Sequence, residues 1–112
     1  MTVMKPDPGV IETRVQQVVE DLKPYQPTRI ILFGSAARGE ADEFSDLDFV
    51  VVKATRQPLL DRLKEVALMC KAPGAIDFFV YTPEEWQQMQ DHASPFAERV
   101  MQEGRIVYEA ES

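Results

Sequence analysis

The chain of 112 residues is 45% hydrophobic and 28% charged, a length and composition that fit one globular domain over residues 1–112. There are 19 acidic residues against 12 lysines and arginines, a net charge of -7, and no Lys/Arg cluster could follow a nucleic-acid backbone, so we expect no nucleic-acid partner. The amino terminus lacks the apolar segment of a signal peptide, and no window approaches the roughly 20 apolar residues of a membrane span. Cys70 is the single cysteine and cannot form an internal disulfide. Together these features predict a cytoplasmic protein without a membrane partner.

An amphipathic helix is the first predicted element. Asp7 followed by Pro8 is typical of an N-cap with proline at the first helical position. Apolar residues then recur at helical spacing as far as Lys23-Pro24, namely Ile11, Val15, Val18, Val19 and Leu22. Thr28–Phe33 is β-branched and almost continuously apolar, which predicts a strand buried on both faces that ends at Gly34. The next six residues, SAARGE, have room for one or two helical turns.

The rest of the chain predicts three more strands and three helices. The longer elements are a strand over Asp46–Val52, a helix over Pro58–Lys71, a strand over Ala75–Thr82 and an edge strand over Arg105–Glu109. Thr82 also opens a short helix, because Thr82 and Glu85 have the spacing of a capping box with proline directly after the cap. Ser94 followed by Pro95 opens the last helix, for which Gly104 is the predicted C-cap.

Connection lengths predict how the strands pair. Only 11 residues separate Gly34 from Asp46, fewer than the dozen or more that a parallel crossover needs, so the first two strands should be antiparallel. A full helix between the second and third strands is the form of a right-handed parallel crossover. With the strands in the order one, two, three, four residues meet at one edge of the sheet: Ser35, Asp46, Asp48 and Asp77. The expected fold class is α/β (α+β), a small mixed β-sheet flanked by helices.

Three aspartates carry the chemistry predicted for that edge. Side chains alternate across a strand, so Asp46 and Asp48 lie on one face about 6 to 7 Å apart, and Asp77 begins the neighbouring strand. Carboxylates so close repel one another unless they are protonated or bound to cations, and hard oxygen ligands suit Mg²⁺ or Mn²⁺. We therefore predict that all three aspartates are metal ligands. The alternatives are an Asx turn or cap after Phe44-Ser45 for Asp46 and Asp48, and a solvent-facing strand position for Asp77.

Gly34 and Ser35 join the first strand to the predicted helical turns. Free backbone N–H groups at a helix amino terminus attract an anion, glycine lets a phosphate approach the backbone, and the Ser35 hydroxyl adds a donor. Arg38, three residues beyond Ser35, is placed to reach another phosphate oxygen. The alternatives are an ordinary strand–turn–helix junction and a surface ion pair for Arg38. A phosphate cradle facing a metal-binding carboxylate cluster indicates phosphoryl or nucleotidyl transfer.

The stretch GSAARGEADEFSDLD contains Gly-Ser, ten residues and Asp-x-Asp, and a later aspartate follows in IDFFVY. On these residues the chain from Thr28 to Tyr81 resembles the minimal nucleotidyltransferases of the DNA polymerase beta superfamily. The resemblance implies a polymerase beta-like nucleotidyltransferase fold in a single minimal domain. The residues to which it assigns roles are Gly34 and Ser35 for a nucleoside triphosphate, Asp46 and Asp48 for metal, and Asp77 for a base-like or metal-bridging role toward the attacking hydroxyl.

Minimal members of this superfamily are commonly encoded beside a HEPN-domain toxin ribonuclease, and some act as antitoxins by transferring AMP to a tyrosine of that partner. The resemblance therefore implies a metal-dependent protein adenylyltransferase, or AMPylase, with ATP as the donor and a HEPN toxin as the partner. Two alternatives stay open. One is an antitoxin that neutralises the toxin by complex formation without catalysis, and the other is an adenylyltransferase acting on a small molecule such as an aminoglycoside.

Overall fold

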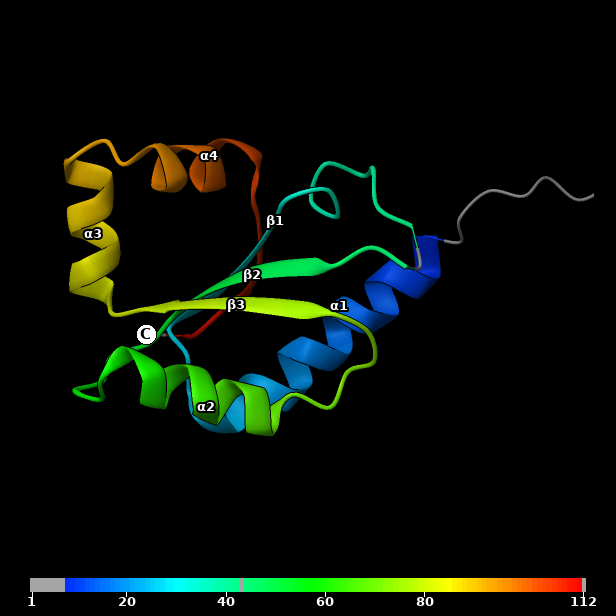
Figure 1. Cartoon of the computed structure of the whole chain (residues 1–112), viewed down its shortest axis with the longest axis horizontal. Coiled ribbons are helices and arrows are strands. Elements are labelled where there is room, and N and C mark those ends of the chain that lie inside the picture. Colours follow the sequence, from blue (N-terminus) through cyan, green and yellow to red (C-terminus); the bar gives the residue numbers. More distant parts are fainter. Residues whose placement is uncertain (1–7, 43, 112) are drawn as a thin grey trace, which may run out of the picture.

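The computed structural model describes residues 8–42 and 44–111 (Figure 1). In chain order its elements are α1 (Pro8–Leu22), the 3-10 helix η1 (Lys23–Tyr25), β1 (Arg29–Phe33), β2 (Leu47–Val52), α2 (Leu59–Met69), β3 (Ile76–Tyr81), α3 (Pro83–Asp91), α4 (Pro95–Glu103) and β4 (Arg105–Glu109). The expected strands and longer helices are present with ends within one or two residues of those predicted. The expected N-cap at Asp7 lies outside the described residues. Among the described helices, none is both long and apolar enough to cross a membrane.

The strands form one four-stranded sheet in the order β3-β2-β1-β4. β1 pairs antiparallel with β2, and β2 pairs parallel with β3, as the connection lengths predict. β4 lies antiparallel on the far side of β1, with an irregularity in the pairing between Ile30 and Ile31. The mixed sheet and its flanking helices confirm the expected fold class.

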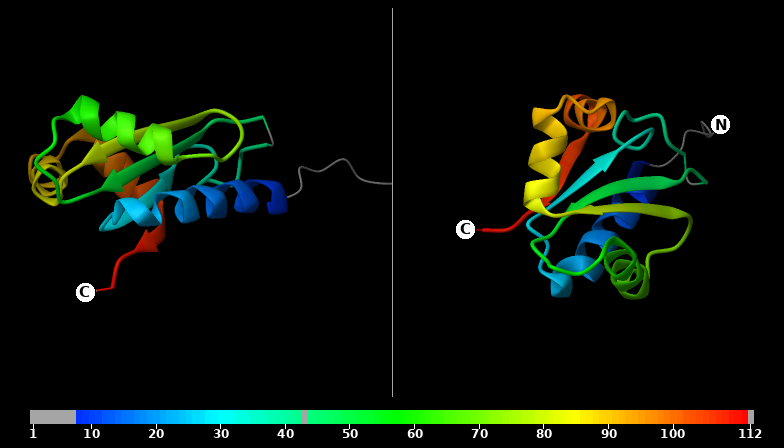
Figure 2. Two further views of the ribbon diagram at one scale, coloured as in Figure 1. Left: turned by 90° about the horizontal axis from the view of Figure 1, so that it is seen from below. Right: turned by 60° about the vertical axis from the view of Figure 1, so that its left-hand side comes forward.

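Helices cover both faces of the sheet. α1 and α2 lie on one face, and α3 and α4 lie on the other (Figures 1 and 2). Because side chains alternate along a strand, β2 divides its apolar residues between two cores. Leu47, Phe49 and Val51 pack on the side of α1 and α2, whereas Val50 and Val52 pack on the side of α3 and α4. Each fully buried side chain of this kind contributes about 1.5 to 3 kcal/mol to stability, so the inner strands hold the two layers together.

Capping residues define the ends of α3 and α4. Thr82 Oγ1 accepts a hydrogen bond from the Glu85 N–H at 3.1 Å, and Glu85 Oε1 accepts one from the Thr82 N–H at 2.8 Å, which confirms the capping box. Ser94 Oγ accepts a longer bond of 3.4 Å from the first turn of α4. Gly104 is the C-cap of α4, as predicted, but its backbone is extended rather than left-handed. A Cβ there would lie 2.3 Å from the Val100 carbonyl oxygen, so close packing explains the glycine.

Candidate active site

One edge of the sheet gathers the residues that the sequence singles out. Gly34 and Ser35 follow β1, Asp46 directly precedes β2, Asp48 is the second residue of β2, and Asp77 is the second residue of β3. In the sheet register, the last residue of β1 lies opposite Asp48, and Asp48 lies opposite Asp77. The end of β1 and the starts of β2 and β3 therefore meet as the strand pairing predicts.

Gly34 is held against Asp48. Its φ angle is +76°, a left-handed conformation that residues with a side chain adopt at a cost. A Cβ on Gly34 would lie 2.6 Å from Asp48 Oδ2, much closer than a van der Waals contact. Any larger residue would therefore strain the backbone and displace the carboxylate as well. The position of the carboxylate therefore requires glycine here.

Negative charge is concentrated around Asp48. This side chain is half-buried, whereas Asp46 and Asp77 are exposed. Burial raises the pKa of Asp48 above its usual value, and the charge of Asp77, hydrogen bonding with Asp77 and the charge of Asp46 raise this pKa further. Within residues 8–42 and 44–111, no lysine or arginine forms an ion pair with any of the three carboxylates. No ion pair among the described residues therefore offsets the charge of these three carboxylates.

The donor atoms at this edge fit a divalent cation. Carboxylate oxygens are ligands that Mg²⁺ and Mn²⁺ prefer, and a cation beside Asp48 and Asp77 would offset the repulsion that raises the Asp48 pKa. In the part of the chain that the structure describes, however, no group of three or more His, Cys, Asp or Glu side chains is arranged to hold a metal ion. Asp46, Asp48 and Asp77 are therefore not preassembled as a three-ligand site among the described residues. Their assignment as metal ligands stays a prediction.

The segment after β1 is a turn, so the expectation of a helix amino terminus here is wrong. The Arg38 N–H donates to the Gly34 carbonyl at 3.2 Å, which completes one helical turn. The Glu40 N–H then donates to the Ser35 carbonyl at 2.9 Å and closes the segment, while Gly39 at φ +76° turns the chain away before a second turn forms. Without a helix there is no helix dipole, so anion binding would depend on the N–H groups of the turn and the Ser35 hydroxyl.

Arg38, the cation expected to contact phosphate, is engaged with two glutamates. Its guanidinium forms ion pairs of 3.2 Å with Glu40 and 3.1 Å with Glu103 of α4. Hydrogen bonds to Glu40 and Glu103 raise the pKa of Arg38, so it carries its charge. Exposed ion pairs of this kind are weak. A phosphate would have to displace both glutamates before this guanidinium could bind it.

Arg14 of α1 contacts the site loops and was missed by the sequence analysis. Arg14 is only 6% exposed, and its guanidinium donates hydrogen bonds to the carbonyls of Ser45 and Pro73, both at 3.0 Å. These carbonyls belong to the loops that lead into β2 and β3. The available signal was its position on the buried stripe of α1, three residues after Ile11 and directly before Val15. An arginine on the apolar stripe of a helix indicates a buried side chain that donates hydrogen bonds to polar groups inside the protein.

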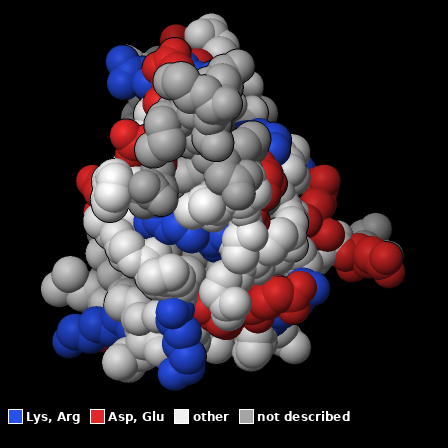
Figure 3. All heavy atoms as spheres, turned by 90° about the vertical axis from the view of Figure 1, so that its right-hand side faces the viewer, with Lys and Arg blue, Asp and Glu red and all other residues white. Residues whose placement is uncertain are grey.

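The end of the molecule where these loops meet is hollowed. Figure 3 shows a band of basic atoms near the centre of this face, with acidic side chains toward its sides. A cavity of about 560 Å³ lies between the start of α1 and the loops, lined by Val10, Arg14, Phe44 and Gly74 among others. Although the chain as a whole is acidic, the guanidinium of Arg14 therefore lines a hollow at this end of the molecule.

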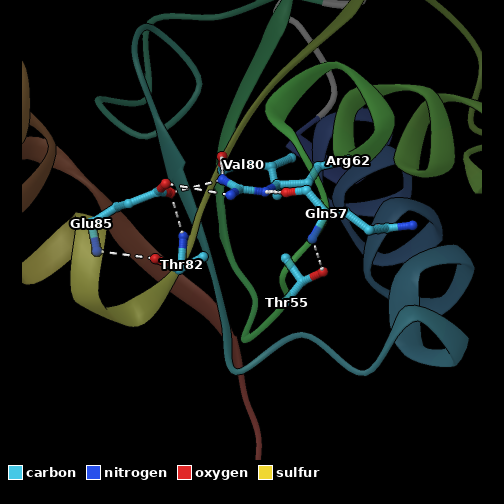
Figure 4. A network of polar contacts seen from close by, with 6 residues as sticks. All are labelled: Thr55, Gln57, Arg62, Val80, Thr82 and Glu85. Carbon is cyan, nitrogen blue, oxygen red and sulfur yellow. Dashed lines mark hydrogen bonds and ion pairs between the residues drawn. The ribbon is translucent and has the colours of Figure 1, made fainter.

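A second polar network lies at the other end of β3 (Figure 4). Arg62 of α2 is 7% exposed, pairs with Glu85 at 2.7 and 3.3 Å, and donates to the Gln57 carbonyl at 2.8 Å. Hydrogen bonding from Arg62 lowers the pKa of Glu85 below its usual value. The adjoining cavity of about 460 Å³ is lined by these two residues with Tyr81 and Met89, among others. Because Arg62 and Glu85 pair with each other, we infer that this network stabilises the fold.

Comparisons with known proteins agree with the architecture. A family model described as "Nucleotidyltransferase domain" matches residues 13–72. A protein assigned as a nucleotidyltransferase from Sulfolobus solfataricus is similar in structure, with a TM-score of 0.61, 18% identity, and coverage of 99% of this chain and 96% of that one. A protein assigned as a minimal nucleotidyltransferase has a TM-score of 0.57, 24% identity, and coverage of 92% and 98%. A toxin–antitoxin structure with AMP-PNP has a TM-score of 0.53, 17% identity, and coverage of 86% and 73%. No curated protein sequence matches the chain.

Proposed function

The chain belongs to the nucleotidyltransferase domain family, and from this premise we propose that it transfers AMP from ATP to an acceptor hydroxyl with the help of Mg²⁺ or Mn²⁺. The observation that carries the proposal is the register of the sheet, which sets Asp48 opposite Asp77 at the edge where Gly34 packs against Asp48. A cation bound beside these two carboxylates would offset the charge repulsion that contributes to the raised pKa of Asp48.

Each residue of this edge has a role in the proposed reaction. The N–H groups after Gly34 and the Ser35 hydroxyl bind the triphosphate, with Arg38 on an outer oxygen. Asp46, Asp48 and Asp77 would hold the divalent cation, which supplies charge neutralisation at the phosphate under attack. Asp77 accepts the proton of the acceptor hydroxyl.

The order of the strands supports separate sides for donor and acceptor in this proposal. β2, which contains Asp48, lies between β1, which ends at Gly34, and β3, which contains Asp77. The triphosphate therefore approaches Asp48 from the β1 side and the acceptor hydroxyl from the β3 side, which suits an in-line displacement. Since β3 is an edge strand, the acceptor side of the site faces outward from the sheet.

A protein side chain is the proposed acceptor, specifically a tyrosine of a HEPN toxin to which this chain acts as antitoxin. The support is twofold. All described helices and strands build the sheet and its two helical layers, so an acceptor has to reach the open β3 side from outside that unit. A toxin–antitoxin structure with AMP-PNP shares the fold.

Labelled AMP transfer tests this function. The chain is incubated with labelled ATP, Mg²⁺ and the product of the neighbouring gene. We expect the label on that partner, and we expect Asp48→Asn to reduce labelling at least a hundredfold, because the carboxylate is lost from the centre of the site. Asp61→Asn is the matched control, since Asp61 is an exposed aspartate in the first turn of α2. Labelling that survives Asp48→Asn would contradict the proposed chemistry.

One observation favours a second candidate, neutralisation of a toxin by binding alone. Arg38 is paired with Glu40 and Glu103 rather than free for a phosphate. If binding suffices, Asp48→Asn will protect cells from the toxin as well as the wild-type chain does, while partner labelling is lost. Failure of Asp48→Asn to protect would favour the transferase.

A further inference from the structure

Arg14 joins the two loops that precede the aspartate-bearing strands. Nη1 donates to the Ser45 carbonyl at 3.0 Å, Nε to the Pro73 carbonyl at 3.0 Å, and Nη2 to the Ala75 carbonyl at 3.4 Å. The first carbonyl directly precedes Asp46, and the other two lie in the loop that ends two residues before Asp77. One side chain of α1 therefore fixes both loops at once.

The second loop is shaped around this guanidinium. Gly74 has a φ of +90°, and a Cβ at this position would lie 2.3 Å from Arg14 Nη2. The two loops are also joined directly, because the Leu47 N–H donates to the Ala75 carbonyl at 3.1 Å. The Ala75 carbonyl thus accepts from both Arg14 and Leu47. This places the guanidinium at the point where the β2–β3 pairing begins.

The choice of arginine at a buried position calls for an explanation. Arg14 is 6% exposed, and within the described residues it forms no ion pair, so its charge is met by carbonyl oxygens alone. Burying a guanidinium is costly, and a well-packed apolar side chain generally serves stability as well or better. Its planar fork of donors, however, holds several carbonyls in a fixed arrangement, which an apolar residue cannot do.

We propose that Arg14 is a positioning residue that sets the starts of β2 and β3 in register and so fixes Asp48 and Asp77 relative to each other. Its consequence for metal binding rests on the function proposed above, whereas its structural part does not. The competing explanation is that Arg14 stabilises the fold in general. Arg62 is the control, because it is equally buried and also donates to backbone carbonyls, but at the far end of β3, where it also forms an ion pair with Glu85.

The experiment compares Arg14→Met, Arg14→Lys and Arg62→Met in the full chain. Amide hydrogen exchange at Leu47, read by NMR relative to core amides of β1, reports the loop junction. Mn²⁺ binding, followed by the paramagnetic resonance of the free ion, reports the carboxylates. We expect Arg14→Met to speed exchange at Leu47 at least tenfold and to weaken Mn²⁺ binding at least tenfold. Arg14→Lys should recover part of both, because one ammonium reaches fewer carbonyls. Arg62→Met should leave both readouts within about twofold of wild type.

Each result has a fixed meaning. Equal exchange at Leu47 in Arg14→Met and Arg62→Met would overturn the positioning role. Faster exchange at Leu47 with unchanged Mn²⁺ affinity would overturn the link to the carboxylates. A wild-type chain that binds no Mn²⁺ would overturn the proposed function, while the exchange data would still decide whether Arg14 orders the loops. Should Arg14→Met not fold, the comparison of Arg14→Lys with Arg62→Lys carries the same test.

Discussion

Gly34 and Gly39 form a matched pair for testing the site at single-residue resolution. Both have φ +76°, but a Cβ at Gly34 would lie 2.6 Å from Asp48 Oδ2, whereas nothing lies within 4 Å of one at Gly39. Alanine at either position costs about 1 to 2 kcal/mol for the left-handed backbone. Only Gly34→Ala should also displace Asp48. We expect it to lose more stability in urea unfolding than Gly39→Ala and to lower AMP transfer at least tenfold. Equal activity of the two variants would contradict the role given to this contact.

The site residues that the sequence predicts are recognised from neighbouring residues, whereas Arg14, which it does not predict, makes its contacts with residues far away in the chain. Gly34, Asp48 and Asp77 are identifiable because short motifs and strand ends place them, and strand pairing follows from connection lengths. Arg14 acts on carbonyls 31 and 59 residues away in sequence. Local pattern describes only the helix on which it lies, so its partners become visible only in the folded chain.

At the scale of elements, hydrophobic periodicity and capping residues predicted the strands and longer helices, and two features escaped. The SAARGE segment favours helix locally, yet Gly39 turns the chain after a single turn. The partner of β4 is β1, a pairing of segments far apart in sequence that the pattern of RIVYE alone does not specify. The backbone of Gly39 decides the first outcome locally, whereas contacts between distant segments decide the second.

The two capped helices allow a prediction about element stability. Thr82 makes a reciprocal capping box with Glu85 at 2.8 and 3.1 Å, whereas the Ser94 cap relies on one bond of 3.4 Å. Thr82→Ala should therefore cost about 1 kcal/mol, and Ser94→Ala clearly less. Urea unfolding measures both. AMP transfer should be unchanged in either variant, because these caps lie away from the edge that contains Asp48. A larger loss in Ser94→Ala would contradict this ranking of the caps.

For the molecule as a whole, Asp48 links stability to pH. Because its pKa is raised on folding, the native chain binds this proton more tightly than the unfolded chain does. The free energy of unfolding therefore falls as the pH rises from the ordinary aspartate range through the folded-state pKa of Asp48. Above the folded-state pKa of Asp48 the penalty is complete, and the concentration of negative charge at one edge lowers the stability of the entire domain.

A divalent cation should reverse this penalty. Mn²⁺ at a hundred times its Kd stabilises a native chain that alone binds it by about 2.7 kcal/mol. We expect thermal unfolding, followed by circular dichroism, to show the full rise in Tm at pH 7 and a smaller one at pH 4, because protons compete for Asp48. Asp61→Asn should keep the rise. Asp48→Asn should be more stable than wild type at pH 7 without metal and should gain nothing from Mn²⁺. An equal gain in Asp48→Asn would place the cation elsewhere, because the stabilisation depends on the affinity of the native chain for Mn²⁺ and loss of a ligand lowers that affinity.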